Sequence, residues 1–137
     1  MTPKKGARKS IERARWRDFL HVADNFYKGA ELAKEFEYWN ASGLLIIHSA
    51  IALTDALTVK VGGVKSSGED HMAAVGLLRE TVSLDERGNE AARHLVRMID
   101  QKNLVSYSGD IYTRAEVAAL WKHLERYRSW ALLVLGG

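Results

Sequence analysis

The sequence predicts an all-α fold, an up-and-down bundle of about five helices. Three observations predict it: apolar residues recur at three- and four-residue spacing, proline is absent after Pro3, and no segment shows the sustained apolar–polar alternation of a half-buried strand. The chain has 137 residues, of which 47% are hydrophobic and 27% charged, and it is long enough to bury one core. We expect residues 9–137 to form this single bundle.

The first two helices are predicted to be long. One runs from about Lys9 to Phe36, and Asn40 is a natural N-cap for the next, which runs to about Val61. The second helix is apolar on nearly every side, which places it at the centre of the bundle. The first carries one apolar stripe, made of Phe19, Val22, Phe26, Ala30, Ala33 and Phe36.

A third and a fourth helix are predicted to follow. A loop rich in glycine and serine precedes a third helix from about Glu69 to Thr81. A fourth helix begins at Ser83 or Asp85, and we expect it to fray between Lys102 and Ser108. Its buried stripe is formed by Leu84, Ala91, Leu95, Met98 and Ile99.

The fifth helix is predicted to begin at a capping box. Thr113 is followed three residues later by Glu116, so each side chain can bond the backbone of the other. Gly109 suits the preceding turn, and the helix runs to about Leu135.

Residues 1–8 are predicted to form a basic, flexible arm. Residues 1–17 hold seven lysines or arginines against one acid, whereas the whole chain carries a net charge of only +3. Such an arm can hold a polyanion through its phosphates, but a solvated terminus is the simpler interpretation. No apolar run follows it, so we do not interpret it as a secretory signal. The absence of cysteine is compatible with a reducing cytoplasm.

The longest apolar run, ASGLLIIHSAIALTDALTV, approaches the length of a membrane span. It contains His48 and Asp55, and a carboxylate at the centre of a bilayer costs about 2.5 to 3.5 kcal/mol. We therefore predict a buried helix and no membrane. His48 and Asp55 lie two turns apart on one face, where they either anchor neighbouring side chains and backbone or brace a polar site.

Several kinds of chemistry have no signature in the chain. The five histidines form no His-x-x-x-His pair and no Glu-x-x-His pair, so we predict no metal site and no cofactor. The stretch VGGVKSSGED lacks the spacing of a phosphate-binding loop, which excludes nucleotide hydrolysis by that route.

The stretch DQKNLVSYSGDIYT holds the candidate ligand-binding residues, Lys102, Asn103 and Tyr107. A lysine can contact a phosphate, an amide can fix orientation, and a tyrosine can stack on a base. The simpler interpretation is a helix end with a dipole-stabilised lysine, a capping asparagine and a half-buried tyrosine.

The helix order resembles that of the HEPN superfamily of small helical bundles. EFEYWNASGLLIIHSAIALTDAL is similar to the passage from the first long helix into the apolar second one. GEDHMAAVGLL is similar to the short third helix with its leading histidine, here His71. Many members carry a ribonuclease motif of an arginine, a polar residue, three further residues and a histidine.

This resemblance places Lys102 at the arginine, Asn103 at the polar residue and Tyr107 at the histidine of that motif. A phenol with a reference pKa of about 10 is poorly matched to proton transfer near neutral pH, and lysine lacks the planar fork of arginine. The resemblance therefore implies a subgroup that binds rather than cleaves, with His48, Asp55 and His71 as supporting polar residues.

The function we predict is a non-catalytic module that binds RNA or a nucleotide. The resemblance also implies a homodimer, for which the apolar C-terminal stretch WALLVL offers surface. It further implies a stress, toxin–antitoxin or defence setting and a protein partner from the same operon. The alternatives are a metal-independent ribonuclease toxin with an altered active site, and a helical bundle that only binds other proteins. Tyr107 argues against the ribonuclease.

Overall fold

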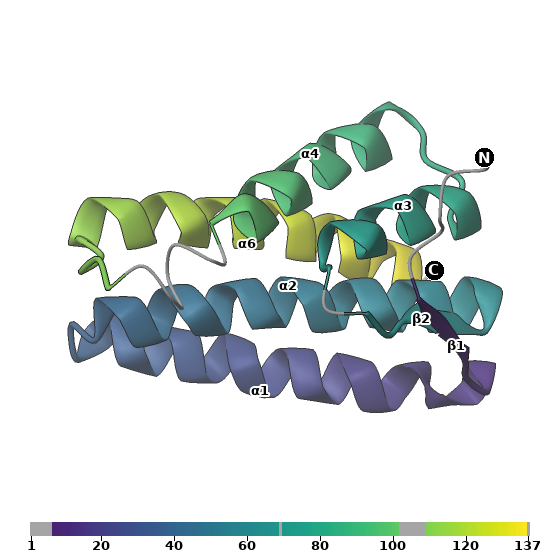
Figure 1. Ribbon diagram of the computed structural model, residues 1–137, viewed down its shortest axis with the longest axis horizontal. Helices are drawn as coiled ribbons and strands as arrows, with labels where there is room; N and C mark the ends of the chain where they lie inside the picture. The colour runs from purple at the N-terminus through teal and green to yellow at the C-terminus, as the bar shows by residue number, and fades with distance from the viewer. Residues whose placement is uncertain (1–6, 69, 102–108, 137) are drawn as a thin grey trace.

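The predicted all-α bundle is confirmed. The computed structural model describes residues 7–68, 70–101 and 109–136, and a small two-stranded sheet accompanies the helices there (Figure 1). The α-helices in these ranges are α1 (Trp16–Glu35), α2 (Trp39–Gly62), α3 (Met72–Thr81), α4 (Glu86–Asp100) and α6 (Arg114–Gly136).

Helix α2 is the central element, as its apolar sequence predicts. It packs against α1, α3, α4 and α6, and in Figure 1 it lies side by side with α1. Small residues let the helices approach closely, and their polar atoms bond the neighbouring backbone: Ser42 and Ser49 donate to the carbonyls of Ala30 and Ala23, each at 2.8 Å. Each fully buried Leu or Ile on α2 contributes about 1.5 to 3 kcal/mol.

Among the described residues, α2 alone is long and apolar enough to cross a membrane. Most of its apolar length is buried inside the protein, which is what the core helix of a soluble protein shows. This agrees with the expectation that Asp55 keeps the segment out of a bilayer.

The first helix begins later than predicted. Residues Arg8–Ser10 form strand β1, Arg13–Arg15 form the 3-10 helix η1, and α1 starts only at Trp16. Strand β1 pairs antiparallel with β2 (Val64–Ser66), in the loop that follows α2. A three-residue strand has no detectable period, and its partner lies more than fifty residues away, so the local sequence does not show this pairing.

The sheet fixes part of the basic segment. Ile11 donates its backbone N–H to the Gly63 carbonyl at 2.9 Å, and the guanidinium of Arg8, the last residue of the predicted arm, donates to the Glu80 carboxylate at 2.9 Å. Gly63 has a φ of 64°, a left-handed conformation that suits glycine at the C-terminus of α2.

Asn40 does not cap α2, which corrects the prediction for this residue. The helix starts at Trp39, so Asn40 already lies inside its first turn. The Asn40 amide instead accepts the N–H of Tyr112 at 2.8 Å and donates to the Asp110 carbonyl at 2.9 Å. It therefore holds the segment before α6 against the start of α2.

The other predicted helix starts are largely confirmed. Asp85 caps α4 by accepting the N–H of Gly88 at 2.8 Å. Thr113 and Glu116 form the predicted capping box of α6, with backbone-to-side-chain bonds of 3.0 and 3.2 Å. Helix α3 begins at Met72, whose N–H bonds the Asp70 side chain at 3.0 Å, rather than at position 69, which lies outside the described residues.

Candidate functional site

The predicted ligand-binding residues Lys102, Asn103 and Tyr107 lie outside the described residues. Gln101, which precedes them in the chain, accepts a bond from the Tyr112 hydroxyl at 3.0 Å. The role assigned to the three residues stays a prediction.

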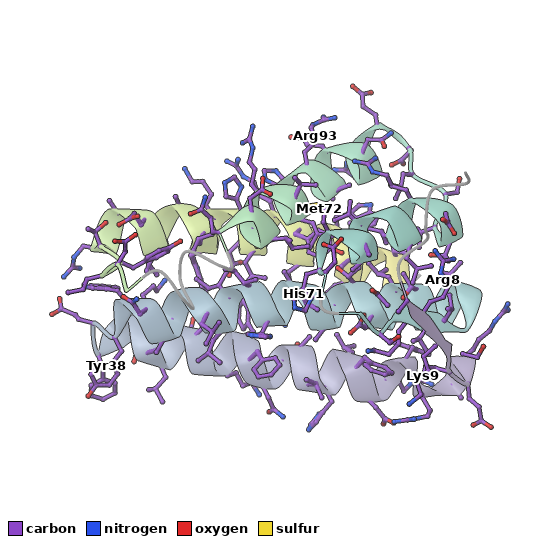
Figure 2. All side chains as sticks on the ribbon, in the orientation of Figure 1. Arg8, Lys9, Tyr38, His71, Met72 and Arg93 are labelled. Carbon is purple, nitrogen blue, oxygen red and sulfur yellow. The ribbon has the colours of Figure 1, made fainter. Side chains whose placement is uncertain are left out.

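The three supporting polar residues lie on different parts of the fold. His48 packs against Phe26 of α1, with 5.7 Å between ring centres, whereas Asp55 lies 3.9 Å from the Lys65 amine of β2. His71 precedes the first residue of α3 (Figure 2). His48 and Asp55 thus share a helix but contact different elements.

A polar cluster at the seam between α4 and α6 is the best candidate site. The Nδ1 atoms of His94 and His123 lie 2.8 Å apart, and the rings are tilted by 46°. His94 is buried and His123 is partly buried, and no carboxylate of the described residues forms an ion pair with either ring. We call these residues, with Arg93, Arg97, Lys122 and Arg126, the histidine site.

The same short pattern places both histidines. Basic–His–Leu–x–Arg occurs as RHLVR at residues 93–97 of α4 and as KHLER at residues 122–126 of α6. Leu95 and Leu124 are fully buried, so each preceding histidine lies about 100° round its helix, at the seam. The two basic residues of each pattern are four apart and therefore neighbours on the helix surface.

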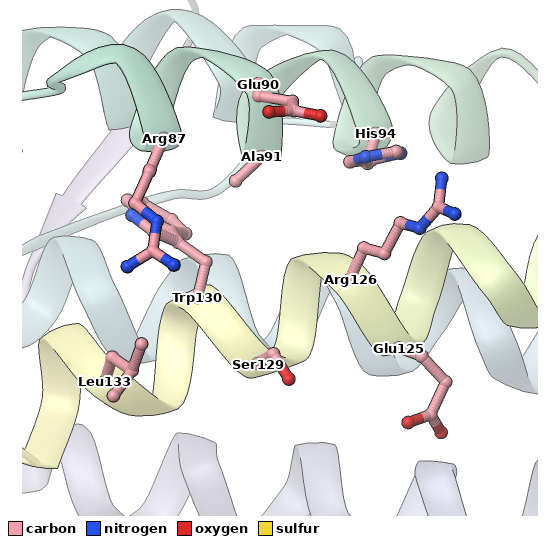
Figure 3. Close-up of a pocket in the computed structure, with 9 residues that line it drawn as sticks. All are labelled: Arg87, Glu90, Ala91, His94, Glu125, Arg126, Ser129, Trp130 and Leu133. Carbon is pink, nitrogen blue, oxygen red and sulfur yellow. The ribbon is translucent and has the colours of Figure 1, made fainter.

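Two open hollows flank the histidine pair. The first has a volume of about 390 Å³ and includes His94, and the second has about 300 Å³ and includes His123. In Figure 3, Arg126 extends from α6 toward His94, and Arg87 extends from α4 toward α6. The first hollow is lined by Arg87, Glu90, Ala91, His94, Glu125, Arg126, Ser129, Trp130 and Leu133. The second is lined by Arg97, Asp100, Gln101, Tyr112, Glu116, Ala119, Leu120 and His123.

The charges that act on the pair are mainly positive. Burial lowers the pKa of His94, and Arg126 lowers it further while Glu90 opposes this. Burial also lowers the pKa of His123, and the charges that act with it are all cationic: His94, Arg97, Arg126 and Lys122. Both imidazoles are therefore biased toward the neutral form in the free protein.

Two of the four acidic side chains that line the hollows bond other groups, whereas Glu90 and Asp100 remain beside the cations. Glu125 accepts the Tyr27 hydroxyl at 2.5 Å and points away from α4 in Figure 3, and Glu116 belongs to the capping box. Within residues 7–68, 70–101 and 109–136, none of the four cations of the histidine site forms an ion pair. The like-charged neighbours Arg93/Arg97 and Lys122/Arg126 each cost about 0.2 to 0.5 kcal/mol in helix stability, which a bound anion would offset.

The site suits an anion better than a metal ion. The described part of the chain holds no group of three or more His, Asp or Glu side chains that could bind a metal. Nδ1 atoms that share a hydrogen bond are also not free to coordinate an ion. Guanidinium groups and imidazole N–H groups, in contrast, are the donors that bind phosphate oxygens.

The sequence does not reveal this site through metal-ligand spacing, because such spacing rules connect only histidines that are close in the chain. His94 and His123 are 29 residues apart, and no local spacing rule connects them. The repeated basic–His–Leu–x–Arg pattern is the signal that could have found them. No known protein family, curated protein or solved structure was found to match this chain, so the resemblance to the HEPN superfamily stays a prediction.

Proposed function

We propose that this protein binds RNA or a nucleotide through phosphate at the histidine site. The observation that carries the proposal is the His94–His123 pair with four cations around it, none of which is ion-paired in the described part of the chain. Arginine and lysine supply most of the affinity for a nucleic-acid backbone, because they release its condensed counterions.

The test is a salt series. A fluorescent oligouridine of about ten nucleotides is titrated with the protein between about 50 and about 200 mM salt, and binding is followed by anisotropy. We expect affinity to fall steeply over this range. The double variant Arg97→Gln/Arg126→Gln should reduce the slope of log affinity against log salt by about one for each contact removed.

The control variant removes two positive charges outside the histidine site. Lys28 of α1 and Arg79 of α3 are exposed, so Lys28→Gln/Arg79→Gln should keep the slope of the unaltered protein. Equal losses in the two double variants would show that net charge alone drives binding and would contradict a specific site. Competition by uridine monophosphate separates a nucleotide site from an RNA site.

A metal-independent ribonuclease is the second candidate, because the structure places two imidazoles in a cationic groove. Histidine can act as general acid and base near neutral pH, which Tyr107 cannot. RNA cleavage in excess chelator that is lost in both His94→Gln and His123→Gln would favour this enzyme. If cleavage equals that of buffer, the binding module remains.

The cellular setting is part of the same proposal. The resemblance to the HEPN superfamily supports a homodimer in a stress, toxin–antitoxin or defence operon, with a partner protein encoded nearby, and the absence of cysteine is compatible with the cytoplasm. A small nucleotidyltransferase gene beside this one would support the toxin–antitoxin setting. Copurification of that gene's product would identify the partner.

A further inference from the structure

We propose that the His94–His123 pair takes up one proton when an RNA phosphate binds beside it, so that RNA affinity rises as pH falls. This inference rests on the proposed function and adds the regulation of the same site. It starts from the contact between the two rings, whose Nδ1 atoms lie 2.8 Å apart.

That contact limits the pair to one positive charge. A bond between two Nδ1 atoms requires one hydrogen, so one neutral ring carries its hydrogen on Nδ1 and the other carries it on Nε2. The first ring then has a lone pair on Nε2, which repels a phosphate oxygen. A proton added there makes both Nε2 atoms donors and keeps the bond, whereas a second proton would break it.

The groups around the pair explain why the proton arrives with the ligand. In the free protein, burial and nearby cations oppose a further positive charge on either ring. A bound phosphate places negative charge among these cations and favours the charged imidazole. The charged groups that face the pair or line the adjoining hollows are Arg87, Glu90, Arg93, Arg97 and Asp100 of α4, and Glu116, Lys122, Glu125 and Arg126 of α6.

The sign of the pH dependence follows from this difference. The pair binds its proton more tightly in the complex than in the free protein, so its pKa is higher in the complex. RNA affinity therefore rises as pH falls below the pKa of the complex, and it becomes constant below the pKa of the free protein. One coupled proton gives at most about a tenfold change in affinity for each pH unit between them.

The experiment uses the full chain and oligouridine with a 5′-hydroxyl end, because neither its phosphodiesters nor its bases titrate between about pH 5.5 and about pH 8. We expect affinity at constant salt to rise about tenfold or more over this range. Calorimetry in two buffers of different ionisation enthalpy should show uptake of about one proton per site. The ring NMR signals of His94 and His123 should shift on binding.

Two variants assign the effect. His94→Gln/His123→Gln should bind through the remaining cations with a flat pH profile, and His21→Gln, on the exposed face of α1, should keep the profile of the unaltered protein. If the double variant does not fold, the calorimetric uptake and the ring signals of the unaltered protein decide. RNA binding without proton uptake overturns this inference and leaves the proposed function intact, whereas no binding at any pH overturns the proposed function itself.

Discussion

Tyr127 is the largest fully buried side chain in the described residues, and its hydroxyl has one partner. The Thr54 hydroxyl lies 2.5 Å away and donates its own hydrogen to the Ala50 carbonyl at 2.8 Å. Tyr127 is therefore the donor to Thr54. Burial raises the pKa of Tyr127 above its ordinary range, which keeps this hydrogen in place.

Because Tyr127 donates and Thr54 accepts, removing one hydroxyl should change stability by a different amount from removing the other. Tyr127→Phe removes the donor and should lower the free energy of unfolding by about 1 kcal/mol. Thr54→Val has nearly the same shape but leaves the buried Tyr127 hydroxyl without an acceptor, so it should cost more, about 1 to 3 kcal/mol. Urea unfolding of both variants and of the double variant measures this. The double variant should cost less than the sum, and a milder effect of Thr54→Val would contradict the assigned donor.

The contact between the two histidines could not be predicted from local sequence rules, whereas several helix caps could. Local rules predicted the Asp85 cap and the Thr113/Glu116 box because each involves residues three apart. Asn40 satisfied the same rule, yet its amide bonds a segment 70 residues away. The contact between His94 and His123 also depends on which helices pack together, so composition and spacing could not show it.

At the scale of elements, one ion pair joins the small sheet to the central helix. Lys65 of β2 lies 3.9 Å from Asp55 of α2, whose side chain is only 13% exposed, and it also stands over the Phe19 ring of α1. Burial raises the pKa of Asp55 to about 7, although Lys65 lowers it in part. The carboxylate is therefore close to half ionised near neutral pH.

The sign of the resulting stability change follows from linkage. Because the folded pKa of about 7 lies above the unfolded value of about 3.9, Asp55 favours folding below about pH 4, and this is lost as pH rises through 7. Relative to Asp55→Asn, the unaltered protein should lose on the order of 3 kcal/mol between about pH 4 and about pH 8. Urea unfolding across this range measures it. Asp18 is exposed, so Asp18→Asn should keep the pH dependence of the unaltered protein's unfolding free energy. If Asp55→Asn keeps that pH dependence as well, Asp55 is not its cause.

Helix α1 was predictable because its apolar residues recur at helical spacing, and α2 because its apolar run is too long for a strand. Strands β1 and β2 were not, since each has three residues and their pairing closes a loop that includes both α1 and α2. Arg8–Ser10 therefore form a strand at the predicted junction between the basic arm and the first helix. The strand pairing depends on a contact between distant segments, which the local preferences of the residues do not show.

At the scale of the whole molecule, the larger exposed apolar surface lies at the end of α1 rather than in the C-terminal stretch. The C-terminal stretch WALLVL was the predicted dimer surface, yet Ala131 and Leu135 are buried there and the Lys60 amine bonds the Leu135 carbonyl. The larger exposed apolar group lies near the end of α1. Leu32 and Phe36 are 56% and 63% exposed, and with Tyr38 they line a hollow of about 320 Å³.

We expect this face of α1 to meet a second copy of the chain. Its exposed apolar side chains lie together on one face, so a two-fold contact would cover this group with the same group of the second copy. Light scattering should show a dimer at micromolar concentration, and Leu32→Glu should yield monomer by placing a charge in the apolar contact. Leu133→Glu alters an equally apolar side chain of the C-terminal stretch, 66% exposed, and should leave the dimer intact. A dimer broken by Leu133→Glu alone would move the interface to α6, and a monomer in the unaltered protein would remove it altogether.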